Sequence, residues 1–222
     1  MLKLSKLFFW IIAPPGIFVF GCRLFAVLNS DLLLSQQCIV AMYGFFAGSV
    51  LWLLLGRFLQ FFHVLEHETT HLLFGLLFFK KPKAISASDR GGRTELYGGN
   101  FIITLAPYFF PTLSFLLLAF FPLLDKKFHL AFYAALGFFT GYHLISNFQE
   151  FKFSQPDIRE AGFVFSPLFC LFGGLACLGV ILGFLAEGFG GSGMFFVDSF
   201  NLALETGAVL FETAKIQVLQ GR

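Results

Sequence analysis

The chain has 222 residues, of which 57% are hydrophobic and only 13% are charged, and its mean hydropathy is +0.81. A soluble domain of this length does not need so much apolar surface, so the composition excludes a soluble protein and predicts an all-α polytopic membrane protein. The formal net charge of +2 gives no indication of nucleic acid binding. The four cysteines show no C-x-x-C spacing, which argues against a disulfide framework or a cysteine-based metal site.

The first third of the chain is read as three spans. Residues 1–28 open with Lys3 and Lys6 and continue as an apolar run, and we expect a kinked span there because no clean signal-peptide cleavage site follows. A polar loop separates it from a second apolar run, residues 38–79. As a single helix, this run would be about twice as long as the hydrocarbon core of a membrane is thick. This run is therefore expected to form two spans, 38–55 and 58–79.

The second of these two spans contains an H-E-x-x-H motif made by His67, Glu68 and His71. On a helix, residues four apart share one face, so the two imidazoles can bind one metal ion, and Glu68 can reach a water molecule beside it. A shuffled chain of this composition shows the motif about once in 250 cases. Ionisable residues inside a span are costly and point to function, so we predict a zinc site with Glu68 as the general base.

Residues 80–99 form the most strongly basic loop, with five positive and two negative charges. The pair Gly91-Gly92 predicts a short β-hairpin or a re-entrant loop directly after the motif helix. The excess of Lys and Arg indicates that this loop is cytoplasmic. Three spans would then put Lys3 and Lys6 on the opposite side of the membrane.

The rest of the chain is expected to complete about six transmembrane helices. Three further apolar segments are the candidate spans, namely residues 100–124, 128–147 and 162–186. We divide the chain into a transmembrane metalloprotease-like domain, 1–186, and a C-terminal part, 187–222. That part combines a Gly-rich linker or hinge with an amphipathic helix over 195–220, which is expected to contact the lipid bilayer or a partner subunit.

A catalytic zinc site needs a third protein ligand. It should lie near the loop 148–161, because that loop returns to the same side of the membrane as residues 80–99. Asp157 is the first choice, since it follows Pro156 at the start of a helix, although a carboxylate there can also cap the helix. The alternatives are His143, Glu150 and Glu160.

The order of these features resembles the site-2 protease family, the polytopic intramembrane zinc metalloproteases, and in particular its small bacterial branch. The first motif, His67 to His71, matches specifically. A later segment matches loosely, through Asn147, Pro156, Asp157 and Gly162. The family usually has Leu-Asp-Gly where this chain continues from Asp157 with Ile-Arg.

The resemblance implies a multi-pass protein of the bacterial inner membrane that hydrolyses peptide bonds of membrane-protein or peptide substrates. Zinc would activate water, and Glu68 would move its proton to the leaving amine. Residues 80–99 could bind an unwound substrate strand by edge pairing. Two alternatives stay open: a non-catalytic integral membrane subunit of a larger complex with a structural or vestigial metal site, and a transporter, against which the chain shows no internal repeat.

Overall fold

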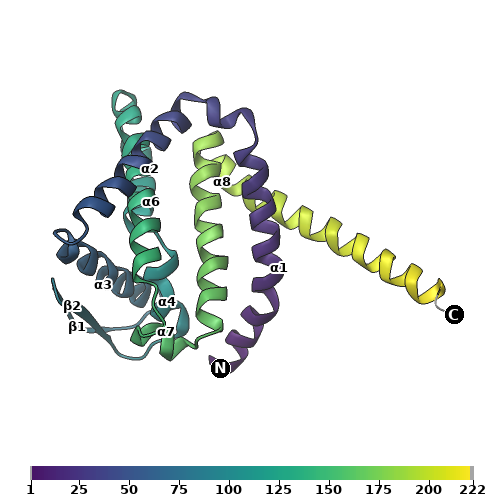
Figure 1. Cartoon of the computed structure of the whole chain (residues 1–222), viewed down its shortest axis with the longest axis horizontal. Helices are drawn as coiled ribbons and strands as arrows, with labels where there is room; N and C mark the ends of the chain where they lie inside the picture. The colour runs from purple at the N-terminus through teal and green to yellow at the C-terminus, as the bar shows by residue number, and fades with distance from the viewer. Residues whose placement is uncertain (1, 221–222) are drawn as a thin grey trace.

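The structure is a computed structural model that describes residues 2–220 and is built almost entirely of helices (Figure 1). The larger elements are α1 (Leu2–Leu28), α2 (Gln36–Leu55), α3 (Gln60–Leu77), β1 (Pro82–Ser88), β2 (Gly91–Leu96), α4 (Phe101–Phe109), α5 (Thr112–Phe120), α6 (His129–Glu150), α7 (Pro156–Ala161) and α8 (Phe165–Gln220). Three short 3-10 helices join them: η1 (Asp31–Leu34), η2 (Phe121–Leu123) and η3 (Lys126–Phe128).

Within residues 2–220, four helices are long and apolar enough to cross a membrane: Leu4–Leu28, Gln36–Leu55, Lys126–Glu150 and Phe165–Gln217. The pair α4 and α5 would add a fifth span, bent by 82° where Pro111 interrupts the helix. The prediction of a helical membrane protein is therefore confirmed. The structure has four or five candidate spans instead of about six, and the motif helix α3 is not one of them.

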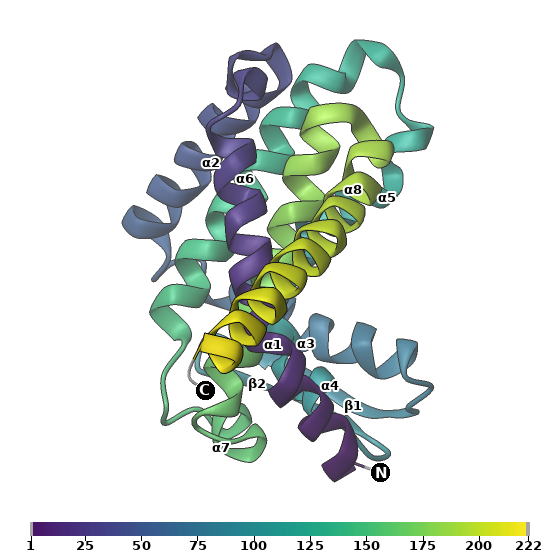
Figure 2. The same ribbon diagram turned by 90° about the vertical axis from the view of Figure 1, so that its right-hand side faces the viewer.

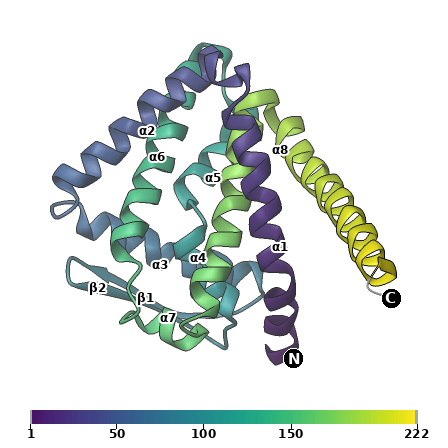
Figure 3. The same cartoon turned by 45° about the vertical axis from the view of Figure 1, so that its right-hand side comes forward.

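Helices α2 and α6 pack backbone against backbone (Figures 1 and 3). Each carries two glycines four residues apart, Gly44 and Gly48 in α2 and Gly137 and Gly141 in α6. A Cβ atom at Gly137 would lie only 1.8 Å from the carbonyl oxygen of Ala41. Small residues at this spacing are what allows two membrane helices to approach so closely.

The hairpin expected after the motif helix is present. Strands β1 and β2 pair antiparallel, with Ser88 opposite Gly91 at the turn and Ala87 opposite Gly92. Gly91 has a φ of +138°, a conformation that a residue with a side chain rarely adopts. The hairpin and α3 lie together at one end of the helical body, beside α4 and α7 (Figures 1 and 3).

The expected placement of the N-terminus opposite the basic hairpin is wrong. Helix α1 crosses the body in one direction and α2 returns, while α3 stays at the end where α2 finishes (Figure 2). The start of α1 therefore lies at the same end as the hairpin and α7, and the Lys6 ammonium donates a hydrogen bond to the Ala161 carbonyl oxygen at 3.0 Å. The prediction failed because it counted α3 as a crossing.

The Gly-rich region near residue 188 is a sharp break inside α8. Glu187 and Gly188 leave the helical conformation, Gly188 with a φ of +66°. The helix then reverses direction, and the second leg first packs back on the body through Phe195 and Ser199, both buried. From Ala203 onward nearly every described side chain is exposed, and the leg extends away from the other helices (Figure 1).

Candidate metal centre

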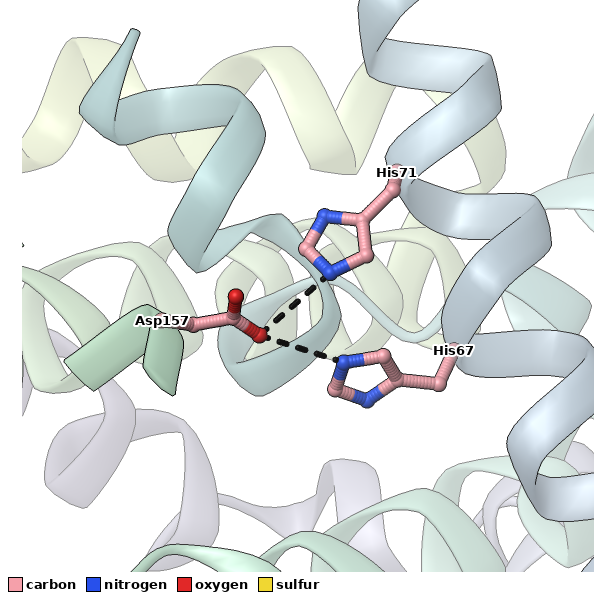
Figure 4. A group of neighbouring side chains, drawn as sticks. All are labelled: His67, His71 and Asp157. Atoms are coloured by element: carbon pink, nitrogen blue, oxygen red, sulfur yellow. Dashed lines mark ion pairs between the residues drawn. The ribbon is translucent and has the colours of Figure 1, made fainter. Parts of the chain in front are cut away.

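The two motif histidines face the same carboxylate. His67 and His71 lie one turn apart on α3, with their ring centroids 4.9 Å apart. Asp157 Oδ2 lies 3.5 Å from His67 Nε2 and 3.4 Å from His71 Nε2 (Figure 4). The three residues each offer one donor atom within 4.8 Å of the others, and no other group of three His, Cys, Asp or Glu among residues 2–220 does so.

Helix α7 delivers Asp157 to this position. Pro156 begins the helix, as its fixed φ favours, and Ile158 and Ala161 are buried against α4 and the start of α8. The Asp157 side chain points at the two imidazoles, and Tyr108 donates a hydrogen bond to its Oδ2 at 3.3 Å. Burial alone raises the pKa of the Asp157 carboxyl, but hydrogen bonds and charge from His67 and His71 outweigh it and hold this pKa well below its usual range.

The backbone of α4 orients His71. His71 Nδ1 lies 2.9 Å from the Ile103 carbonyl oxygen, which can only accept a hydrogen bond, so the ring proton sits on Nδ1. The lone pair of Nε2 is thereby directed at the cluster, which is the orientation that a metal-binding histidine requires. The Asn100 side chain caps α4 by accepting a hydrogen bond from the Ile103 amide at 3.0 Å, so it fixes this turn in place.

Glu68 lies under the hairpin. Only 6% of its surface is exposed, and its Oε2 has no hydrogen-bond partner in the described part of the chain. A Cβ atom at Gly92 would lie 2.5 Å from Glu68 Cγ and 2.8 Å from Oε1, so β2 can pass over the carboxylate only with glycine there. Thr94 fastens the strand by donating a hydrogen bond to the Glu68 carbonyl oxygen at 3.0 Å.

A cleft of about 940 Å³ opens between the hairpin, α3 and α7. The motif residues and Asp157 line it, together with both strands and the end of α6. Charged side chains from the hairpin and from α6 and α7 also reach it, namely Lys83, Asp89, Arg90, Arg93, Glu95, Glu150 and Glu160. The site is therefore accessible from the end of the molecule where the basic hairpin lies.

The other candidates for the third ligand are engaged elsewhere. His143 is buried, and the Asn147 amide contacts its ring nitrogens at 3.0 and 3.1 Å. Glu150 accepts a hydrogen bond from Gln60 at 3.1 Å and faces His63 at 3.5 Å. Glu160 lines the cleft without joining the group of three. Of the four candidates, only Asp157 joins both motif histidines.

The sequence analysis missed His63 as a site residue. It precedes His67 by four residues, so the three histidines 63, 67 and 71 follow one face of α3. This spacing is visible in the sequence and could have identified His63 as a neighbour of the motif. Glu150, which lies opposite His63, is far away in the sequence, and the pairing follows only from the fold.

Comparisons with protein-family models, curated proteins and solved structures find no match to this chain. The fit of a metal ion is therefore judged only from the side chains that the structure brings together. Two imidazole nitrogens and one carboxylate oxygen are the ligands of catalytic zinc in many hydrolases. An ionisable Glu68 buried without a partner beside them is expensive unless a positive charge lies near. The residues present fit a zinc ion.

Proposed function

We propose that this protein is an integral membrane zinc metallopeptidase that hydrolyses peptide bonds of membrane-protein or peptide substrates. The observation that carries the proposal is the convergence of His67, His71 and Asp157 on one point, next to Glu68, on the wall of a large cleft. The resemblance of these motifs to the site-2 protease family supports the same activity. It also favours a bacterial inner membrane as the location.

The chain supplies the parts that peptide hydrolysis needs. A zinc ion held by His67, His71 and Asp157 would act as a Lewis acid on the scissile carbonyl and on water. Glu68 takes the proton of the attacking water and delivers it to the leaving amine. Tyr108 keeps Asp157 oriented, and the Ile103 carbonyl does the same for His71.

The hairpin is the part of the cleft that fits an extended peptide. Both of its strands border the cleft, and in a two-stranded sheet each strand has a free edge. An unwound substrate segment can add to such an edge through backbone hydrogen bonds, which requires no particular side chains. Because β2 lies on Glu68, a segment paired there would run past the general base.

The burial of Glu68 favours a second candidate function. A non-catalytic membrane subunit with a structural metal site would tolerate a carboxylate that the hairpin covers. A free C-terminal helix leg would suit attachment to a larger assembly. The two candidates differ in whether Glu68 is needed for any reaction, so one substitution separates them.

The metal site is tested by the zinc content of the detergent-purified protein. We expect about one tightly held zinc ion in the wild type and its loss in His71→Ala and in Asp157→Ala, because each substitution removes a ligand. The matched control is Glu160→Gln, which lines the same cleft outside the cluster and should keep the metal. Equal zinc content in all four proteins would overturn the assignment.

Catalysis is tested with Glu68→Gln on a membrane-protein substrate in detergent or liposomes. The amide keeps the shape of the side chain and cannot accept the proton, so hydrolysis should fall by about 10² to 10⁴-fold while zinc stays bound. An active wild type whose Glu68→Gln variant is equally active would exclude Glu68 as the base. A zinc-loaded wild type without activity on any substrate would favour the non-catalytic subunit.

A further inference from the structure

His63 is buried on α3 and has one ring nitrogen without a hydrogen-bond partner. Only 5% of the residue is exposed, and Trp52 packs on the ring at a centroid distance of 5.0 Å. Nδ1 lies 3.1 Å from the Tyr142 hydroxyl, which is in turn hydrogen-bonded to Glu66. When the Tyr142 hydroxyl donates its hydrogen bond to the Glu66 carboxylate, its oxygen accepts one from Nδ1–H of His63. In this tautomer Nε2 keeps its lone pair.

That lone pair is directed at a second carboxylate. His63 Nε2 lies 3.5 Å from Glu150 Oε2, and within the described residues it has no hydrogen-bond partner. The His63 ring is buried, whereas the Glu150 side chain is 27% exposed at the wall of the cleft. Two electron-pair donors that face each other at this distance repel unless a positive charge lies between them. The Gln60 side chain lies beside the same carboxylate, at 3.1 Å from Oε1, and its amide can present oxygen in place of nitrogen.

The distance between His63 Nε2 and Glu150 Oε2 matches the distances within the proposed catalytic cluster, which is the group of His67, His71 and Asp157. There, the Asp157 oxygen lies 3.4 and 3.5 Å from the two histidine nitrogens. Two ligands at about 2.0–2.1 Å from one zinc ion in tetrahedral geometry are themselves about 3.4 Å apart. His63 Nε2 and Glu150 Oε2 therefore have the spacing that a shared cation requires.

We propose that His63 and Glu150, with the Gln60 amide oxygen, form a second and weaker binding site for zinc or a similar divalent cation. The site has two strong ligands where the catalytic cluster has three, which makes it the weaker of the two. His63 lies one helical turn before His67. His63, Glu150 and Gln60 all line the cleft. A cation bound there narrows the cleft and adds positive charge one turn from the catalytic cluster.

The site has a regulatory consequence that rests on the proposed peptidase function. Zinc in excess of one equivalent should reduce hydrolysis, because the second ion occupies the cleft beside His67. Glu150→Gln should raise the zinc concentration needed for this inhibition by at least about tenfold, since ligand changes alter metal affinity on this scale. This readout depends on activity, so the binding test that follows does not use it.

The binding test is equilibrium dialysis of the purified full chain against buffered free zinc, with cobalt absorption as a second readout. The wild type should bind two ions, the second at least about tenfold more weakly. His71→Ala should lose the tight ion and keep the weak one, and Glu150→Gln should do the reverse. Glu160→Gln, which removes the same charge from the same cleft, should bind like the wild type.

Two outcomes would overturn the proposal. One is a wild type that binds a single ion at saturating zinc, which would mean that a proton on His63 compensates Glu150. The other is a Glu150→Gln variant that binds both ions with wild-type affinities. If Glu150→Gln fails to fold by size-exclusion chromatography, Gln60→Ala takes its place and should weaken the second ion alone. Loss of the tight ion in His71→Ala reports on the catalytic site separately.

Discussion

Gly92 is the residue that lets the hairpin lie on Glu68, the proposed general base. Replacing it by alanine would put a methyl group within 2.8 Å of both Glu68 Oε1 and Val64 Cγ1, which forces β2 away from α3. We predict that Gly92→Ala keeps its zinc and loses hydrolysis by about 10²-fold, the effect of a displacement of about 1 Å at an active site. The measurement is peptidase activity normalised to zinc content.

Gly99 provides the control for this prediction. It follows the hairpin, and a Cβ atom there would meet nothing within 4 Å, so Gly99→Ala should behave like the wild type. Wild-type activity in Gly92→Ala would show that the contact between β2 and Glu68 has no part in the reaction.

Asn100 is linked to His71, a proposed metal ligand, through a backbone carbonyl. Its side chain caps α4 and holds the turn that contains Ile103, whose carbonyl oxygen orients His71. We predict that Asn100→Ala destabilises the protein by about 1 kcal/mol and weakens zinc binding by about 10-fold, as losses of groups that orient metal ligands do. Zinc competition with a chelator measures the second effect.

A conservative variant at the same position checks the mechanism. Serine is also a good N-cap residue, so Asn100→Ser should recover most of the zinc affinity. If the alanine and serine variants bind zinc equally weakly, the cap is not the means by which Asn100 acts.

Among the helices, the tightest contact joins α2 and α6. A methyl group at Gly137 would lie 1.8 Å from a backbone oxygen of α2, and neither backbone can move without disturbing the other three glycines of the contact. We predict that Gly137→Ala lowers the stability of the detergent-solubilised protein by about 1–3 kcal/mol, the usual effect of overpacking. Thermal or denaturant unfolding measures it.

The matched control lies in α8. Gly174 is also a mid-helix glycine, but a Cβ atom there meets nothing within 4 Å, so Gly174→Ala should be neutral or slightly stabilising. Equal unfolding transitions for the two variants would contradict the close approach of α2 and α6.

The element whose role was hardest to predict is α3. Its sequence is apolar enough to look like the second half of a long hydrophobic run, and hydropathy gives no information about the direction of a helix. The bend at residues 56–59 places α3 beside the hairpin at the end of the body, and this arrangement depends on contacts with β1, β2 and α4. The motif itself and the following hairpin were predictable, because each depends on local sequence.

At the scale of the whole molecule, the two ends of the helical body carry different loops. The hairpin, α7 and the start of α1 lie at one end, and η1 and η3 lie at the other (Figures 1 and 2). Basic residues of the N-terminal region and of the hairpin are thus on one side, which removes the conflict that the predicted topology contained. The positive-inside tendency predicts that this is the cytoplasmic side.

This arrangement predicts the labelling of single cysteines in intact cells. In a Cys22→Ser background, Asp89→Cys at the hairpin turn should be protected from a membrane-impermeant maleimide. Asp31→Cys and Lys126→Cys, which are exposed at the other end, should react. Permeabilised cells should label all three and serve as the control. Reaction of Asp89→Cys together with either of the others in intact cells would contradict the topology.

Sequence reasoning put Asp157 first among the candidates for a third ligand and left His143, Glu150 and Glu160 as alternatives. Asp157, His143 and Glu150 were all suitable by chemistry and by distance along the chain, and the choice depends on the packing of Ile158 and Ala161, which turns α7 toward α3. The pairing of Glu150 with His63 depends on where the end of α6 lies relative to α3, which the sequence does not show. The chemical role of a side chain can be predicted from the sequence. Which residues it contacts depends on the fold.

The origin of the three proposed ligands in distant parts of the chain has a consequence during synthesis. The two histidines leave the ribosome with the third helix, whereas Asp157 follows only after the hairpin and the helices α4 to α6. A nascent chain that ends before Asp157 holds two of the three ligands and lacks the carboxylate, so a growing or truncated chain has no complete metal centre. Under the proposed function, the newborn peptidase cannot cut its neighbours in the translocation machinery until nearly all of its body has been inserted.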